Sequence, residues 1–143
     1  MRALLDVNVL IALLDGGHAH HAAASNWLAA SMDKGWASCP ITQNGCIRIL
    51  SQPNYPNTVP APIVAERLAE ATHHPAHEFW NDSISLLQPG ILKWQRILSS
   101  RHVTDAYLLA LAVAHRGRFV TLDRGISLDA VKGASTANLI VIS

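Results

Sequence analysis

Short apolar segments alternate with helix-forming segments along the whole chain, and this alternation constrains the fold more than any other feature. Runs bounded by turn residues predict strands at 2–5, 36–39, 79–87, 118–123 and 138–143. The segments between them predict helices at 8–14, 20–32, 40–50, 63–74, 92–99 and 103–115. Strands that alternate with helices in this way are typical of an α/β fold with a mostly parallel sheet.

The helix at 103–115 has the clearest boundaries of all the predicted elements. Thr104 can cap its start, and Gly117 lies just beyond its end. Residues 51–62 hold four of the seven prolines, so that segment predicts a loop rather than another helix or strand.

The composition indicates one cytoplasmic domain that spans residues 1–143. Half of the residues are hydrophobic and 15% are charged, which is sufficient for a packed core and excludes a disordered chain. No apolar run approaches the roughly 18 residues that a membrane span needs. The formal net charge of +1 gives no electrostatic signature of a dedicated nucleic-acid binder, and two cysteines make no disulfide framework.

Three of the ten acidic residues share a position in the predicted topology. Asp6 directly follows the first strand, Asp123 follows the strand that begins at 118, and Asp105 lies in the first turn of the helix at 103–115. In a parallel sheet the carboxyl ends of strands and the amino ends of helices meet at one edge, where ligands bind. We therefore expect these three carboxylates to gather there.

Each of these aspartates also has an ordinary structural explanation. Asp105 can stabilise a helix dipole, Asp6 can form a turn with Asn8, and Asp123 can belong to a simple turn. A cluster of all three, however, needs a cation to offset the repulsion between like charges. Oxygen ligands favour Mg²⁺ or Mn²⁺, and such a site can assist attack of water on a phosphodiester.

The chain resembles the PIN-domain family and, within it, the VapC toxins of bacterial toxin–antitoxin pairs. The resemblance rests on four motifs in order, LLDVNVLIAL, SCPITQNGCIRIL, HVTDAYLLALA and GRFVTLDRGI, at 4–13, 38–50, 102–112 and 117–126. It implies a PIN α/β/α sandwich with a central parallel sheet and a Mg²⁺- or Mn²⁺-dependent endoribonuclease. It also implies a VapB-type antitoxin partner, a toxin homodimer and a toxin–antitoxin hetero-oligomer.

Position by position, the resemblance assigns roles to individual polar residues. Asp6, Asp105 and Asp123 match the metal-binding acids of the family, and the polar residues that support them match Asn8 and Thr121. Gln43 departs from the pattern, because the family usually has Glu there. Glutamine keeps an oxygen but loses a negative charge, which weakens cation affinity by about one to a few kcal/mol.

Other basic and aromatic residues yield weaker expectations. Five arginines can supply phosphate contacts with RNA, and Arg124, directly after Asp123, is the best candidate among Arg48, Arg96, Arg101, Arg118 and Arg124. The eight histidines show no zinc-binding spacing, and most of the four tryptophans are expected in the core or at an interface.

Two other functions compete with the ribonuclease hypothesis. One is a catalytically weak binding protein on the same fold that acts through its antitoxin complex at a promoter. The other is a phosphatase of the haloacid-dehalogenase type, which requires Asp-x-Asp after its first strand where this chain has Asp6-Val7-Asn8.

Overall fold

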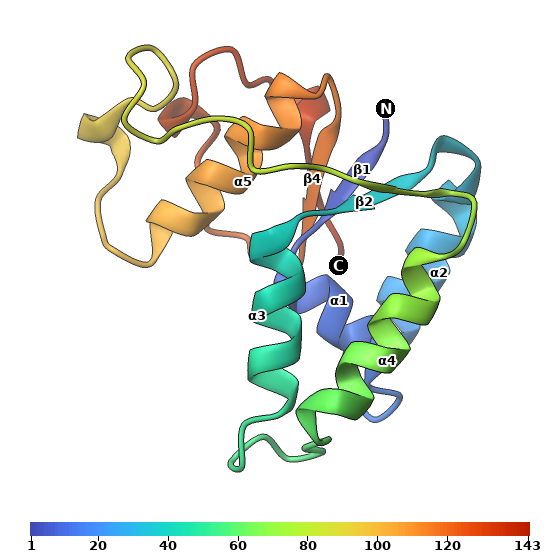
Figure 1. Ribbon diagram of the computed structural model, residues 1–143. Helices are drawn as coiled ribbons and strands as arrows, with labels where there is room; N and C mark the ends of the chain where they lie inside the picture. Colours follow the sequence, from blue (N-terminus) through green and yellow to red (C-terminus); the bar gives the residue numbers. More distant parts are fainter.

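A five-stranded sheet forms the centre of the protein in the computed structural model, which describes all 143 residues (Figure 1). Its strands are β1 (Ala3–Leu5), β2 (Trp36–Ser38), β3 (His77–Phe79), β4 (Arg118–Thr121) and β5 (Leu139–Val141). Their order across the sheet is β3-β2-β1-β4-β5, and all four pairings are parallel. The predicted α/β class with a parallel sheet is confirmed.

Five helices connect the strands and cover both faces of the sheet. They are α1 (Val7–Leu14), α2 (His21–Ser31), α3 (Pro40–Leu50), α4 (Ala61–Thr72) and α5 (His102–Ala114). Because α5 begins at His102, Thr104 lies inside its first turn and does not cap it as expected. None of these helices has the length and apolar character that crossing a bilayer requires.

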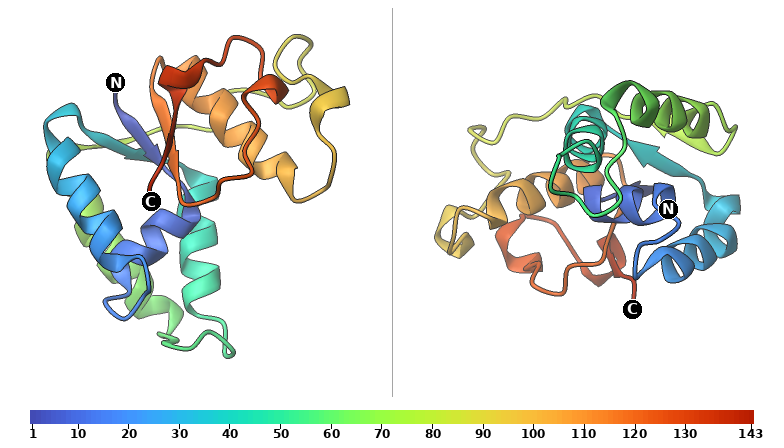
Figure 2. Two further views of the ribbon diagram at one scale, coloured as in Figure 1. Left: turned by 180° about the vertical axis from the view of Figure 1, so that it is seen from behind. Right: turned by 90° about the horizontal axis from the view of Figure 1, so that it is seen from below.

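Helices pack on both faces of the sheet because successive side chains along a strand point to opposite faces. Leu4 and Phe119 point to the face that α5 covers, whereas Leu5 and Val120 point to the face that α1 to α4 cover. All four side chains are fully buried, and Figure 2 shows α5 set apart from the group of α1 to α4. The central strand β1 is therefore apolar throughout, as expected for a strand buried on both faces.

The prediction of a third strand at 79–87 was wrong in its position. The strand is β3, and it ends at Phe79 because its partner β2 has only three residues with which to pair. Residues 84–87 form no strand. Ile84 and Leu86 instead pack as loop residues against the core on the α5 side of the sheet.

The predicted helix at 92–99 was also wrong, apart from one turn of 3₁₀ helix at Trp94–Arg96. The backbone before that turn hydrogen-bonds instead to a loop that is distant in the sequence. Leu92 forms an isolated antiparallel bridge with Val131, and the N–H of Lys93 donates to the carbonyl of Ala130 over 2.9 Å.

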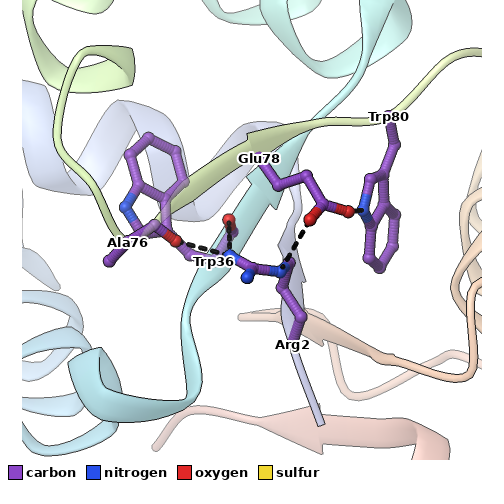
Figure 3. A network of polar contacts seen from close by, with 5 residues as sticks. All are labelled: Arg2, Trp36, Ala76, Glu78 and Trp80. Atoms are coloured by element: carbon purple, nitrogen blue, oxygen red, sulfur yellow. Dashed lines mark hydrogen bonds and ion pairs between the residues drawn. The ribbon is translucent and has the colours of Figure 1, made fainter.

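Arg2 binds together the amino ends of the first three strands (Figure 3). Its Nη1 donates to the carbonyls of Ala76 and Trp36 over 2.6 and 3.4 Å, and its Nε lies 3.5 Å from Oε2 of Glu78. Glu78 in turn accepts a 2.8 Å hydrogen bond from Nε1 of the buried Trp80. Through these contacts, Arg2 fixes the edge of the sheet at which the strands begin, opposite the edge at which they end.

The chain reverses its direction across the sheet at β1. From β1 it moves outward through β2 to β3, and it then returns to the other side of β1 to add β4 and β5. In open α/β sheets, ligands bind outside the carboxyl ends of the strands at such a switch point. The fold thus places the carboxyl ends of β1 and β4 where a site is expected.

We predict that Gly45→Ala destabilises the protein, because α1 and α3 pack too closely for a side chain there. A Cβ atom at this position would lie 2.7 Å from Cγ2 of Val7. Overpacking costs about 1–3 kcal/mol and exceeds the roughly 1 kcal/mol that alanine gains in a helix. Urea unfolding should show a net loss of about 1 kcal/mol.

The double variant Val7→Ala/Gly45→Ala provides the control, since Val7→Ala removes the atoms that the new methyl group meets. We expect the double variant to lose less free energy of unfolding than the two single variants combined. Strict additivity of the two changes would contradict this explanation.

Candidate active site at the carboxyl end of the sheet

Asp6 lies at the end of β1 and caps the amino terminus of α1. One carboxylate oxygen, Oδ1, accepts a 2.7 Å hydrogen bond from the backbone N–H of Val7. The other, Oδ2, accepts a 2.6 Å hydrogen bond from the hydroxyl of Thr121. Only 6% of the Asp6 surface is exposed, and this burial raises the pKa of its carboxyl group despite both hydrogen bonds.

Thr121, at the end of β4, joins the predicted polar residues into one network. While it donates to Asp6, its Oγ1 accepts from Nδ2 of Asn8 over 3.3 Å and from the N–H of Asp123 over 3.0 Å. Oδ1 of Asn8 accepts from the N–H of Leu122 over 3.2 Å. The hydroxyl of Thr121 therefore uses its full hydrogen-bonding capacity, and the ends of β1 and β4 are held in register.

Asp105 and Asp123 complete a group of three carboxylates. Asp105 is half-buried in the first turn of α5, and its pKa is raised to about 6, first by burial and then by the charges of Asp6 and Asp123. Asp123 is exposed, and its Oδ1 accepts a 2.7 Å hydrogen bond from the N–H of Gly125. The fold brings all three predicted acids close enough to repel one another.

No basic side chain forms an ion pair with these three acids. The one ion pair of the chain joins Arg2 and Glu78 on the opposite edge of the sheet. No three His, Cys, Asp or Glu side chains are arranged to enclose a metal ion. Oxygen donors without a basic partner nevertheless fit a hydrated divalent cation, because Mg²⁺ binds through one or two carboxylates and keeps several waters.

Gln43 lies in the first turn of α3, and its side chain is hydrogen-bonded to the sheet. Its Nε2 donates to the hydroxyl of Ser38 over 2.9 Å, and that hydroxyl lies 2.8 Å from Nε2 of His77 on β3. His77 also forms a hydrogen bond with the backbone of Thr72, and burial lowers the pKa of its imidazole. The amide of Gln43 thus begins a hydrogen-bonded relay that runs across β2 to the edge strand.

Two residues of α3 face the acidic group: Asn44, which the sequence analysis missed, and Arg48, which it named only as one of several possible phosphate contacts. Asn44 and Arg48 line an open hollow of about 530 Å³ together with Asp6 and Asp105, whereas Gln43 does not line it. Their four-residue spacing on one helix, directly after Gln43, is the signal that could have identified them. The predicted RNA contact Arg124 is exposed on the turn after Asp123 and lies outside this hollow.

Comparisons with known proteins agree with this architecture. Residues 3–132 match the PIN domain family. Ribonuclease VapC44 of Mycobacterium tuberculosis is 52% identical over 139 residues, covering 97% of this chain and 98% of the relative. Ribonuclease VapC39 of the same organism is 40% identical over 134 residues, covering 93% and 96%.

One solved structure shares the fold at low sequence identity. It is VapBC2 from Rickettsia felis bound to a DNA fragment from their promoter, and it superimposes with a TM-score of 0.60 at 14% identity. The match covers 86% of this chain and 89% of the matched chain, so it supports the predicted α/β sandwich.

We predict that Thr121→Val costs about 2–3 kcal/mol in the free energy of unfolding. Valine has nearly the shape of threonine, but it leaves the buried Oδ2 of Asp6 without its donor. Thr121→Ser, which keeps the hydroxyl, is the matched control and should cost only about 1 kcal/mol for the lost methyl group. Equal losses in urea unfolding for the two variants would refute the role of this hydrogen bond.

We also predict that stability of the metal-free protein falls as the pH rises from about 4 to about 6. The pKa of Asp105 is about 6 in the folded chain and about 3.9 when unfolded, so the folded state binds more protons in this range. Asp105→Asn, which cannot ionise, should be more stable than the wild type at pH 7, and the difference should narrow below pH 4.

Thermal unfolding in EDTA between pH 3.5 and 8 measures both effects of Asp105. Melting curves of wild type and Asp105→Asn that shift in parallel over this whole range would contradict the prediction.

Proposed function

The chain belongs to the PIN domain family of VapC-type toxin ribonucleases, and from this we propose that it is the ribonuclease toxin of a toxin–antitoxin pair. We propose that it hydrolyses RNA phosphodiester bonds with Mg²⁺ or Mn²⁺ at Asp6, Asp105 and Asp123. The observation that carries the proposal is the gathering of these carboxylates, without a basic partner, at the switch point of the sheet.

Each carboxylate has a distinct part in this proposal. Asp6 is the rigid member, because Thr121 and the start of α1 fix its position. Asp105 and Asp123 approach it from α5 and from the turn after β4. Together these three residues would hold a divalent cation, which would supply Lewis-acid chemistry toward a phosphodiester.

The residues beside the acids are proposed to orient the substrate. Arg48 lines the hollow next to Asp6 and Asp105, where a guanidinium can pair with an RNA phosphate. Asn44 lies on the same wall and can hydrogen-bond to sugar or phosphate oxygens. These two side chains offset the repulsion between an acidic site and a polyanionic substrate.

Gln43 is proposed to limit the activity. It supplies no charge where the family resemblance predicts Glu, and its NH₂ group is turned toward Ser38. The remaining carboxylates then bind the cation with less electrostatic attraction. This same feature favours the second candidate function, a catalytically weak protein that acts through its antitoxin complex.

A VapB-type antitoxin and a second toxin copy are the proposed partners. The relatives that match nearly the whole chain are VapC ribonucleases, and the structural neighbour was solved as VapBC2. We propose the same toxin–antitoxin pairing and a toxin homodimer for this chain.

We predict that the protein cleaves structured RNA in Mg²⁺ or Mn²⁺ and that EDTA abolishes cleavage. Asp6→Asn should lower the rate at least 100-fold, because it removes a charge at the metal site. Gln43→Glu should raise cleavage about tenfold at limiting metal, since it restores the missing charge. Gel-based cleavage assays at several metal concentrations measure these rates.

Asp33→Asn is the matched control, since Asp33 is exposed before the amino end of β2, at the opposite edge of the sheet. It should leave cleavage unchanged. If wild type, Gln43→Glu and Asp6→Asn are equally inactive on several RNAs, the nuclease proposal fails and the binding-protein function gains support.

A further inference from the structure

Asp105 lies between two hollows, and only one of them is explained by the proposed reaction. The open hollow with Arg48 lies on the α3 side. On the other side, a smaller pocket of about 250 Å³ lies between the start of α5, the 3₁₀ turn at Trp94–Arg96 and the loop 125–130. We call it the α5 pocket, and Asp105 is the residue shared by both hollows.

The α5 pocket has the wall chemistry that suits a flat aromatic group. Ala106, Ile126 and Leu98 supply apolar surface, and the imidazole of His102 adds a planar ring. Pockets for drug-sized ligands measure about 300–1,000 Å³, so this pocket is of a size for one small group. Unpaired RNA bases are recognised by stacking on such surfaces and by hydrogen bonds at their edges.

The polar rim of the pocket is free to recognise a base edge. The carboxylate of Asp129 has no ion-pair or hydrogen-bond partner within the chain, and the side-chain amide of Gln95 has none either. A carboxylate only accepts hydrogen bonds, so it favours a base edge that carries N–H donors. Guanine presents two such donors side by side on its Watson–Crick edge, N1–H and N2–H₂.

We propose that the α5 pocket binds an unpaired guanine next to the scissile phosphodiester and that Asp129 selects it. The proposal rests on the ribonuclease function proposed above and adds a substrate preference to it. Asp129 accepts from N1–H and N2–H₂, while Gln95 and Arg96 can donate to the O6 and N7 acceptors. The phosphate that joins this nucleotide to its neighbour then lies near Asp105.

The first test measures binding without cleavage. GMP, AMP, CMP and UMP are titrated into ¹⁵N-labelled protein in EDTA, and the backbone amides of Gly125, Ile126, Ser127 and Ala106 are followed by NMR. We expect saturable shifts at these amides, with GMP binding about tenfold tighter than UMP. Asp129→Asn should abolish this preference, and Asp33→Asn should retain it.

The second test maps cleavage sites on a single-stranded RNA of random sequence in Mg²⁺ or Mn²⁺. Wild type should show guanine enriched at one position beside the cut, and Asp129→Asn should lose this enrichment. Equal binding of the four nucleotides, shifts outside the pocket, or an unchanged cleavage profile in Asp129→Asn would overturn the proposal.

The two tests separate this proposal from the proposed function. Cleavage without any base preference leaves the ribonuclease standing and removes the guanine pocket. Selective GMP binding by a protein that cleaves no RNA leaves the pocket standing and removes the ribonuclease. The ¹⁵N spectrum of each variant also shows whether it is folded.

Discussion

The hydrogen bond from Thr121 to Asp6 is the contact on which the candidate site depends. It joins β1 and β4 at the point where the chain changes direction across the sheet, and both partners are buried. Because Thr121 also accepts from Asn8 and Asp123, one hydroxyl sets the relative positions of two of the three acids. Burial of this carboxylate is tolerated because each of its oxygens accepts one hydrogen bond, and each oxygen keeps a lone pair for a cation.

The sequence was most informative for elements that are buried between the layers of the fold, because burial dictates an apolar sequence pattern there. The strands β1 and β4, which precede Asp6 and Asp123, and the helix α5 could be predicted because most of their side chains are apolar and buried. The edge strand β3 could not, since two of its three residues are exposed and its position depends on pairing with β2. The segment 92–99 has helical composition, but its backbone pairs with a distant loop.

The residues of the candidate site likewise differ in how far the sequence predicts their positions. Residues that lie just after a strand or in the first turn of a helix, such as Asp6, Asp123 and Asp105, are placed by topology alone. The neighbours Asn44 and Arg48, and the polar rim of the α5 pocket, depend on which helix face and which loop turn toward the acids. Asp129 has the sequence context of an ordinary turn, and only the packing of loop 125–130 against α5 gives it a place beside Asp105.

The relay from Gln43 through Ser38 to His77 means that position 43 cannot change independently of the edge strand. The side-chain amide of Gln43 donates a hydrogen bond to the Ser38 hydroxyl, which leaves that hydroxyl free to donate its own hydrogen to a neutral imidazole of His77. A carboxylate at position 43 has no proton to give, so Ser38 must turn toward it and His77 must become a donor. The hydrogen-bonding roles of residues 43 and 77 are therefore coupled through Ser38, although no hydrogen bond joins the two directly. Substitutions at the two positions should accordingly occur together in evolution.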